Sequence, residues 1–308
     1  MLSRTAQNLF WMGRYIERAD ATARLIEMGR AMAMLPGANE SKEWHSVARA
    51  TAAPEDLTGE GATAEDVIRH LLLDGNNPSS IRSCLTQARA NGRAIRTALT
   101  QDMWESLNDG WRTLEQASPV RLKDELPRYL DWTRQRAAAF RGSTETSHLR
   151  NDGYTFLRIG EYIERADMTL RLLDVKYYVL LPETDVVGGG RDYHQWTSVL
   201  RATSALRTYH HVYRDNYTPW GIAEFLVLNR MFPRSVMFSY LGLERHLDDL
   251  AAVYGARHAC QNTAAGMVKR LKGFDMGSLF QFGLHEFIVE AVSCTHRLSR
   301  EIAAAYDF

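Results

Sequence analysis

A segment of fifteen residues occurs twice in this chain and constrains its fold more than any other feature. Residues 13–27 read GRYIERADATARLIE and residues 160–174 read GEYIERADMTLRLLD, so ten of the fifteen paired positions are identical. Repetition of this length indicates that a structural unit is used twice. We therefore predict two related repeats, residues 1–146 and 147–308, that form one continuous domain.

The repeated segment has the hydrophobic period of an α-helix. At about 100° per residue, the apolar side chains of Ile16, Ala19 and Ala23 fall on one side of such a helix. A second match follows each copy, because WHSVARA at 44–50 returns as WTSVLRA at 196–202. Nothing in the chain resembles a strand-rich region. We predict an all-α fold, a duplicated bundle in which two repeats of about four to five helices pack into one unit.

The opposite face of the segment is charged in both copies. The first copy carries Arg14, Glu17, Asp20 and Arg24. The second copy carries Glu164, Asp167 and Arg171, with Glu161 at the position of Arg14. Weak ion pairs on a solvated helix surface would account for one such face. Its repetition favours either a network of arginines and carboxylates between helices or a ligand site. The sequence leaves these alternatives open.

A further candidate site lies where Asn77-Pro78-Ser79-Ser80 begins a helix. An Asn cap followed by Pro in the first turn is typical of a helix start, where free N–H groups attract anions. Asn77, Ser79 and Ser80 are therefore candidates for ligand binding. An ordinary capped helix start is the alternative.

Three arginines follow on the same predicted helix. Arg89, Arg93 and Arg96 are spaced four and three residues apart and so share one face. Three like charges repel each other unless acids or an anion lie opposite them. The acids that we expect there are Glu17, Asp20 and Glu105. The nearby amides of Asn91 and Asn108 complete the set of binding candidates.

Charge and hydropathy argue against several classes of protein. The chain carries 37 basic and 37 acidic residues, so its net charge is zero and a nucleic-acid partner is not expected. It has no apolar run of about 18 residues and no basic-then-apolar start, so we predict a cytoplasmic protein without a membrane partner. Histidine spacings fit neither zinc nor di-iron sites. No metal or other cofactor is expected.

Several motifs, taken in order, resemble the alpha-E family of bacterial proteins. They are LSRTAQNLFWMGRYIERADATARL, NPSSI, ARANGRAIR, DMWESLN and FLRIGEYIERADMTLRLLD, and they cover essentially the whole chain. Ala90 and Glu161 depart from the family pattern, which often has an acidic residue and usually an arginine at these positions. The family is an all-helical group of unknown function.

The resemblance also implies partners. Alpha-E proteins are typically encoded beside a circularly permuted ATP-grasp protein, often together with a transglutaminase-like protein, and an amide-bond-forming or peptide-modifying system is inferred from this company. The first hypothesis is an accessory or substrate-binding component that binds the ATP-grasp protein or its peptide substrate.

Two alternative hypotheses remain. In the second, the chain is an enzyme in which Arg89, Arg93 and Arg96 clamp an acyl phosphate or a peptide carboxylate. Glu17 or Glu105 would then act as the general base. In the third, the chain is purely a structural helical scaffold, with every charged pair satisfied inside the bundle.

Overall fold

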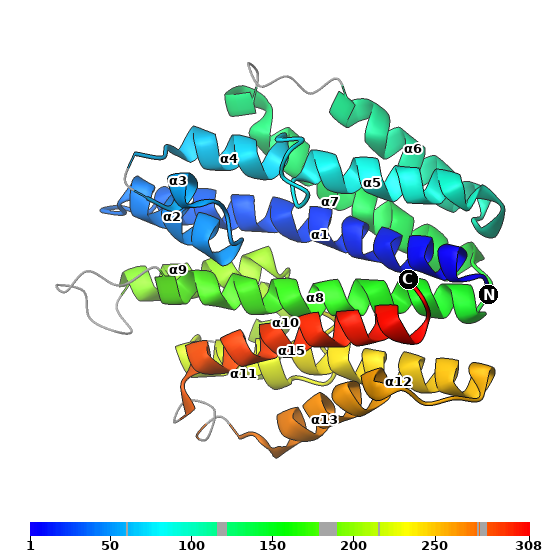
Figure 1. Ribbon diagram of the computed structural model, residues 1–308. Helices are drawn as coiled ribbons and strands as arrows, with labels where there is room; N and C mark the ends of the chain where they lie inside the picture. Colours follow the sequence, from blue (N-terminus) through cyan, green and yellow to red (C-terminus); the bar gives the residue numbers. More distant parts are fainter. Residues whose placement is uncertain (60, 116–121, 179–189, 215, 276, 278–281) are drawn as a thin grey trace.

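The computed structural model describes the chain except for residues 60, 116–121, 179–189, 215, 276 and 278–281, and it is helical throughout (Figure 1). The described residues form fourteen α-helices, one short 3-10 helix and no strand. The first seven α-helices are α1 Ser3–Ala33, α2 Glu40–Ala50, α3 Glu55–Thr58, α4 Ala64–Leu72, α5 Ile81–Ala94, α6 Gln101–Glu115 and α7 Leu122–Ser147, with η1 Arg96–Ala98 between α5 and α6.

The later helices are α8 Asp152–Tyr178, α9 Gly190–Ala202, α10 Leu206–Tyr213, α11 Pro219–Leu228, α12 Val236–Tyr254, α13 Ala259–Gly273 and α15 Leu284–Ala305. The all-α prediction is confirmed. The predicted number of helices is wrong, because each half has seven α-helices within its described part rather than four or five. Short turns split the helical stretches more often than hydrophobic periodicity alone indicated.

Helices α1 and α8 form the centre of the molecule and run side by side in the same direction (Figure 1). The helices that precede α8 lie on the α1 side of this pair, and most of those that follow lie on the other side (Figure 1). Besides the α1–α8 contact, α2 packs on α8 and α9 packs on α1 across the two halves. The two copies of the repeated segment therefore face each other at the core.

Two glycines allow the backbones of α1 and α8 to touch. A Cβ atom added at Gly13 would lie 2.4 Å from the carbonyl oxygen of Leu157. A Cβ atom added at Gly160 would lie 2.1 Å from the carbonyl oxygen of Phe10. Non-bonded atoms do not approach so closely, so only glycine fits at either position. Both glycines open the repeated segment, which therefore sets the closest approach of the two helices.

The charged face of α1 is buried, as is its apolar face. Ile16 and Ala23 are 3% and 0% exposed, and the acids Glu17 and Asp20 on the opposite face are 1% and 0% exposed. The interpretation of this face as a solvated surface is therefore wrong. Most of α1 is enclosed because α2, α4, α5, α7, α8 and α9 pack around it.

The helix predicted from Asn77 begins later than expected. Ser80 is the N-cap of α5, and its Oγ accepts a hydrogen bond from the backbone N–H of Ser83 at 3.1 Å. Asn77 instead shapes the preceding turn, where its Oδ1 accepts a hydrogen bond from the N–H of Ser79 at 2.9 Å. Ser79 therefore lies in a turn that leads into α5, and its side chain is partly exposed.

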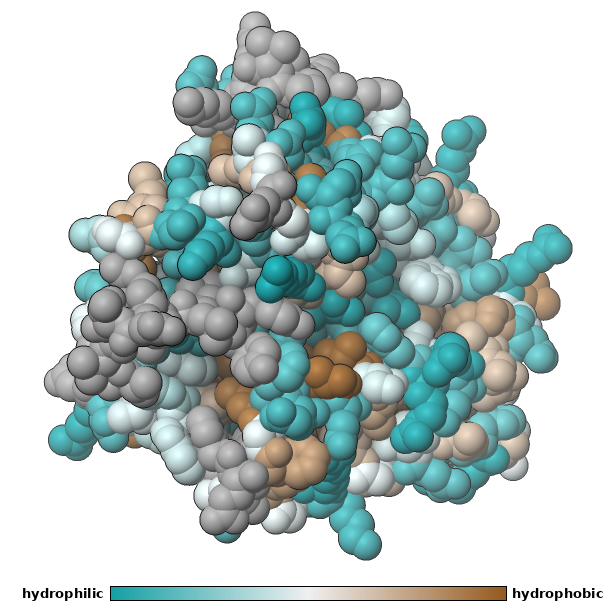
Figure 2. Space-filling view, turned by 60° about the vertical axis from the view of Figure 1, so that its left-hand side comes forward, coloured by the Kyte–Doolittle hydropathy of each residue, from teal (hydrophilic) through white to brown (hydrophobic). Residues whose placement is uncertain are grey.

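The surface on the side of α2 and α9 is mainly hydrophilic, with small hydrophobic areas between the polar side chains (Figure 2). Large apolar side chains are instead concentrated between the helices, among them Phe10, Phe156, Tyr209, Tyr240 and Phe287. Among the helices that the structure describes, none is both long enough and apolar enough to span a membrane.

Candidate ligand-binding site

Glu-Arg pairs from the two copies of the repeated segment link α1 to α8 reciprocally. Arg165 donates hydrogen bonds to Glu17 through Nε at 3.0 Å and Nη2 at 2.9 Å. Arg18 donates to Glu164 through Nε at 2.5 Å and Nη2 at 2.9 Å. Each guanidinium group thus forks across a buried carboxylate of the other helix, the strongest geometry for this kind of pair.

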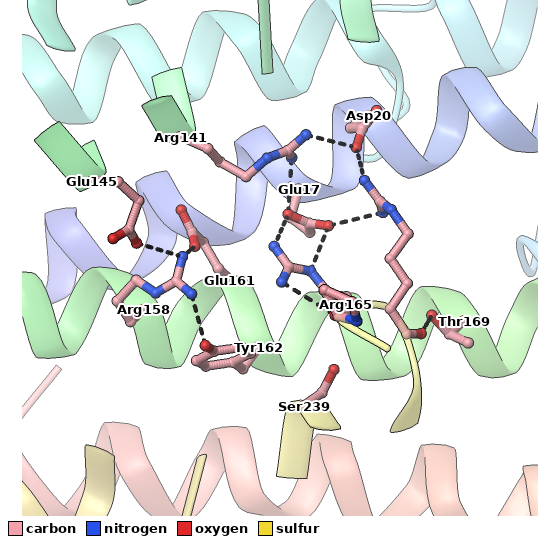
Figure 3. Close-up of polar contacts among 12 residues, drawn as sticks. Glu17, Asp20, Arg141, Glu145, Arg158, Glu161, Tyr162, Arg165, Thr169 and Ser239 are labelled. Atoms are coloured by element: carbon pink, nitrogen blue, oxygen red, sulfur yellow. Dashed lines mark hydrogen bonds and ion pairs between the residues drawn. The ribbon is translucent and has the colours of Figure 1, made fainter. Parts of the chain in front are cut away.

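Two more arginines complete the surroundings of Glu17 and Asp20. Arg141 of α7 donates to Glu17 at 3.1 Å and to Asp20 at 3.2 Å. Arg234, in the turn before α12, donates to Glu17 at 3.2 Å and to Asp20 at 2.6 Å. Figure 3 shows how Arg141 and Arg165 converge on Glu17 from opposite sides. We call this group the Glu17 cluster, which consists of Glu17, Asp20, Arg24, Arg141, Arg165 and Arg234.

The Glu17 cluster keeps its two carboxyl groups ionised. Burial alone would raise the pKa of Glu17, but the guanidinium groups of Arg165, Arg141 and Arg234 hold that pKa well below its usual range. For Asp20, burial is likewise outweighed, mainly by Arg234, and its pKa is lowered. Both oxygens of Glu17 accept hydrogen bonds from arginines, so Glu17 offers no free lone pair to a reactant in this structure.

The corresponding acids of the second copy border a cavity. Glu164 and Asp167 lie in the wall of a cavity of about 370 Å³ between α1, α8 and the turn that precedes α5. Its lining also includes the arginines Arg14, Arg18 and Arg171 and the side chain of His296. The side chains of Asn77 and Ser79 line it from the turn before α5. We call it the Ser79 cavity.

Glu164 is held by two arginines that line the Ser79 cavity. Besides the fork from Arg18, it accepts a hydrogen bond from Arg14 Nε at 2.9 Å. Arg14 Nη1 donates to Ser299 Oγ at 2.8 Å, and its guanidinium group stacks 4.7 Å from the ring of Trp11. Burial would raise the pKa of Glu164, but Arg18 and Arg14 lower it, so this carboxylate is ionised.

Asp167 is held differently from Glu164. Arg171 donates to its Oδ2 at 2.7 Å and to the carbonyl oxygen of Ala50 at 3.0 Å. The other oxygen, Oδ1, lies 3.1 Å from Nε2 of His296 but accepts no hydrogen bond from the described residues. Burial would raise the pKa of Asp167, but His296 and Arg171 lower it. Asp167 is 4% exposed.

The arginines of the Ser79 cavity retain unused hydrogen-bond donors. Two of the three nitrogens in each guanidinium group of Arg14, Arg18 and Arg171 donate to protein oxygens. Nη2 of Arg14, Nη1 of Arg18 and Nη2 of Arg171 make no hydrogen bond to any residue that the structure describes. A cavity lined by three arginines with free N–H groups is suited to an anionic group such as a carboxylate or phosphate.

The predicted binding candidates fall into separate places. The Ser79 cavity brings together Arg14, Asn77, Ser79, Glu164, Asp167 and Arg171. The Glu17 cluster contains Glu17, Asp20 and Arg24. Ser80 is fully buried at the cap of α5 and does not line the cavity. The structure thus assembles part of the charged face and part of the predicted helix start at one cavity.

The arginine ladder of α5 does not face the expected acids. Arg89 donates to Asn108 Oδ1 at 3.0 Å, and its guanidinium group lies 4.0 Å from the ring of Trp111. Arg96 lies 5.4 Å from the ring of Trp104. These rings belong to α6 and provide cation–π contacts, so the arginines are accommodated without a carboxylate opposite them. The expected pairing with Glu17 and Asp20 is wrong.

The other predicted members of this group are near the surface. Arg93 is exposed, and Asn91 is half-buried. Glu105 is exposed and accepts a hydrogen bond from Gln101 at 2.7 Å. The α5–α6 group is therefore separate from the Ser79 cavity. Nothing in its geometry joins Glu105 to the ladder as an acid or a base.

Several residues that complete the site were not among the sequence candidates. Arg18 and Arg165 lie in the part of the repeat that is identical in both copies, so the repetition itself could have identified them. Arg141, Arg234 and His296 lie on α7, before α12 and on α15, far from the repeated segment in sequence. No local pattern marks them, because only the packing of these elements brings them to α1 and α8.

Comparison with known families agrees with this geometry. Residues 1–306 match the alpha-E family, described as a predicted alpha-helical domain with a conserved ER motif. The chain belongs to the alpha-E family. In this alpha-E chain the dipeptide Glu-Arg occurs at 17–18, 164–165 and 244–245, and the first two pairs form the reciprocal links between α1 and α8.

Curated relatives of this alpha-E chain carry no assigned function. An uncharacterised protein of Mycobacterium bovis and one of Mycobacterium tuberculosis are each 23% identical to it over 328 residues. Each alignment covers 97% of this chain but 36% of the relative, so the chain spans about a third of the length of these proteins. No solved structure matches the chain. Among the described residues, no His, Cys, Asp or Glu side chains gather in threes to hold a metal ion.

Proposed function

We propose that this alpha-E protein binds the carboxylate of a peptide or related acid in the Ser79 cavity. In this proposal it serves as a substrate-binding, accessory component of a peptide-modifying system that includes an ATP-grasp protein. The observation that carries the proposal is the convergence of Arg14, Arg18 and Arg171 on one cavity, each with an unused guanidinium nitrogen. A cavity of about 370 Å³ has room for the end of a peptide.

The state of the acids supports binding over catalysis. Glu164 and Asp167 have lowered pKa values and are engaged by arginines, so at neutral pH both are weak proton acceptors. Glu17, a predicted general base, is enclosed in the Glu17 cluster, and the other, Glu105, is exposed on α6. The geometry therefore favours the accessory hypothesis over the enzymatic one. For the Glu17 cluster itself, the geometry favours a structural role.

The proposal includes an internal duplication, with repeats at residues 1–146 and 147–308. Besides the repeated sequence, the contacts of equivalent residues support it. Arg24 donates to Asp20 at 3.0 Å and to the carbonyl of Ala202 at 2.9 Å, as Arg171 does to Asp167 and Ala50. In this view the two copies began alike, but of their equivalent acids only Glu164 and Asp167 of the second copy now line the Ser79 cavity.

A binding measurement tests the proposed carboxylate site. N-acetyl-diglycine and its C-terminal amide would be titrated into the protein by calorimetry. We expect the acid to bind and the amide to bind about tenfold more weakly or not at all, because a charge-assisted hydrogen bond is lost. Equal binding of the two, or binding of neither, would contradict the proposal.

Arg171→Lys and Arg24→Lys form a matched pair for this measurement. Both arginines hold an acid on their own helix and a backbone carbonyl of the other half, but only Arg171 lines the cavity. Both changes therefore remove the same kind of fork. Only Arg171→Lys should weaken binding of the acid.

The partner part of the proposal needs a separate experiment. The protein would be co-expressed with the ATP-grasp protein encoded nearest to it, and with any neighbouring transglutaminase-like protein, and then passed through size exclusion. Co-elution at a stable ratio would support an accessory role. Separate elution of two folded proteins would count against it, while leaving the carboxylate measurement unaffected.

A further inference from the structure

The turns that precede α5 and α12 are built alike. Ser80 and Ser235 are the N-caps of these helices, and their Oγ atoms accept backbone N–H groups at 3.1 Å and 3.0 Å. The N–H of Ser80 also donates to the carbonyl three residues earlier at 3.0 Å, and that of Ser235 does so at 2.9 Å. In each turn the residue before the cap follows a proline. That residue is Ser79 in the first turn and Arg234 in the second.

Arg234 places a guanidinium group against the acids of the first repeat. Its Nη1 donates to Glu17 Oε1 at 3.2 Å and its Nη2 donates to Asp20 Oδ2 at 2.6 Å. The hydroxyl of Thr169 donates to its main-chain carbonyl at 2.9 Å, which fixes the turn. The side chain thus bridges the two carboxylates as an internal occupant.

The equivalent acids of the second repeat lack this occupant. Asp20 Oδ2 accepts hydrogen bonds from both Arg234 and Arg141, whereas Asp167 Oδ1 accepts none within the described chain. Asp167 is 4% exposed, and it lines the Ser79 cavity. A buried carboxylate oxygen without a donor is costly, so its position against a cavity points to a donor that comes from outside.

The charge and the shape of the Ser79 cavity both indicate that this outside donor is a guanidinium group. A side chain as short as Ser79 leaves space where Arg234 extends in the other repeat. The neighbouring His296 is half exposed, and its Nε2 lies 3.1 Å from Asp167 Oδ1, an ion-pair contact that lacks hydrogen-bond geometry. A planar guanidinium group can reach both Asp167 and Glu164, as Arg234 reaches Asp20 and Glu17.

We propose that the Ser79 cavity takes a guanidinium group from a ligand, in the place that Arg234 fills in the other repeat. This deepens the proposed function and rests on it for the carboxylate. Together they describe a ligand with a guanidinium group and a carboxylate, which is either free arginine or a peptide that ends in arginine. The acids Glu164 and Asp167 bind the cationic end, and the unused donors of Arg14, Arg18 and Arg171 bind the anionic end.

Four small probes separate the two proposals. L-arginine and L-citrulline have the same shape, but citrulline carries a neutral ureido group. We expect L-arginine to bind about tenfold or more tightly than L-citrulline, because the charge-assisted bonds to Asp167 and Glu164 require the cation. Agmatine carries the guanidinium group without the carboxylate, and N-acetyl-diglycine carries the carboxylate alone.

The outcomes are distinct. Equal binding of L-arginine and L-citrulline, or no binding of L-arginine at millimolar concentration, overturns the guanidinium proposal. If N-acetyl-diglycine still binds in that case, the carboxylate proposal survives. If agmatine binds and N-acetyl-diglycine does not, the guanidinium proposal stands and the carboxylate proposal falls. Tighter binding of N-acetyl-glycyl-arginine than of free L-arginine identifies a peptide end as the source.

Two substitutions test where the guanidinium group of the ligand binds. Asp167→Asn should weaken the binding of L-arginine about tenfold and change the affinity for N-acetyl-diglycine by no more than about twofold. Because loss of a buried charge can also unfold the protein, Ser79→Arg gives an independent test. This substitution supplies a guanidinium group from the turn itself, so it should prevent the binding of L-arginine. It should also raise the thermal midpoint of unfolding above that of Ser79→Met, whose side chain is also long but carries no charge. Full binding of L-arginine by Ser79→Arg would overturn the proposed location.

Discussion

Gly160 lies so close to Phe10 that a Cβ atom at Gly160 would be 2.1 Å from the carbonyl oxygen of Phe10. Because the obstacle is helix backbone rather than a flexible side chain, neither helix can yield without moving the whole α1–α8 contact. We expect Gly160→Ala to lower the free energy of unfolding by about 3 kcal/mol or more. Urea denaturation followed by circular dichroism measures this.

A matched control comes from Gly266, which lies inside α13 with nothing within 4 Å of an added Cβ. Gly266→Ala should raise stability by about 0.5–1 kcal/mol through helix propensity alone. Similar stabilities of the two variants would show that the close contact does not limit the fold.

Glu17 and Glu161 are both buried carboxylic acids, yet we expect opposite results from replacing them with glutamine. Glu17→Gln removes the charge that faces Arg141, Arg165 and Arg234, so it should cost about 3–5 kcal/mol. Among the described residues, Glu161 has one oxygen without a partner and pairs through the other with Arg158 alone, and burial raises its pKa although Arg158 partly opposes this. Glu161→Gln should therefore change stability by less than about 1 kcal/mol, or increase it. Equal losses in urea denaturation would contradict this assignment.

Stability should fall in acid because of the carboxylates in the core. The pKa values of Glu17, Asp20, Glu164 and Asp167 are lower in the folded protein than their usual values. As the pH falls through about 4, the unfolded chain takes up protons before the folded chain does, so the free energy of unfolding decreases. The raised pKa values of Glu161 and Asp174 act in the opposite direction, but the carboxyl groups with lowered pKa values outnumber them.

Urea denaturation at a series of pH values from neutral to about 3 measures this dependence. The Glu161→Gln variant serves as the control, because it removes one of the opposing contributions and should make the loss in acid steeper. A free energy of unfolding that stays constant below about pH 5 would show that the four carboxylates do not depend on the arginines for their state.

Arg234→Ala should convert the Glu17 cluster into a second cavity that accepts a guanidinium ion. Loss of the two charge-assisted hydrogen bonds to Glu17 and Asp20 should lower stability by about 1.5–3 kcal/mol, since Arg141 and Arg165 remain. Methylguanidinium at millimolar concentration should then raise the thermal midpoint of Arg234→Ala more than methylammonium does. An equal rise in the thermal midpoint with both ions would show that binding in this cavity does not require the forked geometry of a guanidinium group.

The repeated segment already contained much of the fold. The helical period of residues 13–27, its return at 160–174 with ten of fifteen residues identical and the absence of strand patterns predicted an all-α chain, which the described residues confirm. The predicted charged-face candidates were also informative, since Arg14, Glu164, Asp167 and Arg171 meet at one cavity. Local sequence could give these results because helix period and repetition depend on residues near one another in the chain.

The partners predicted for the arginines of α5 were wrong, because elements distant in sequence supply the groups that these arginines contact. The ladder on α5 was expected to face Glu17, but Trp104 and Trp111 of α6 receive Arg96 and Arg89 instead. A like-charge pattern shows that a partner is needed and does not say which one. The aromatic rings of α6 contact these arginines, and Glu17 pairs with Arg141 and Arg234 instead.

The sequence by itself determined that two helices carry nearly the same set of charged residues on one face, because the repeat fixes which residues share each helix face. Only the tertiary structure decided which charges meet. Arg141 and Arg234 reach Glu17, whereas the turn before α5 presents Ser79 near Asp167 and leaves a cavity there. The physical reason is that an ion pair between helices depends on positions set by packing across more than a hundred residues, and no spacing along one helix encodes that distance.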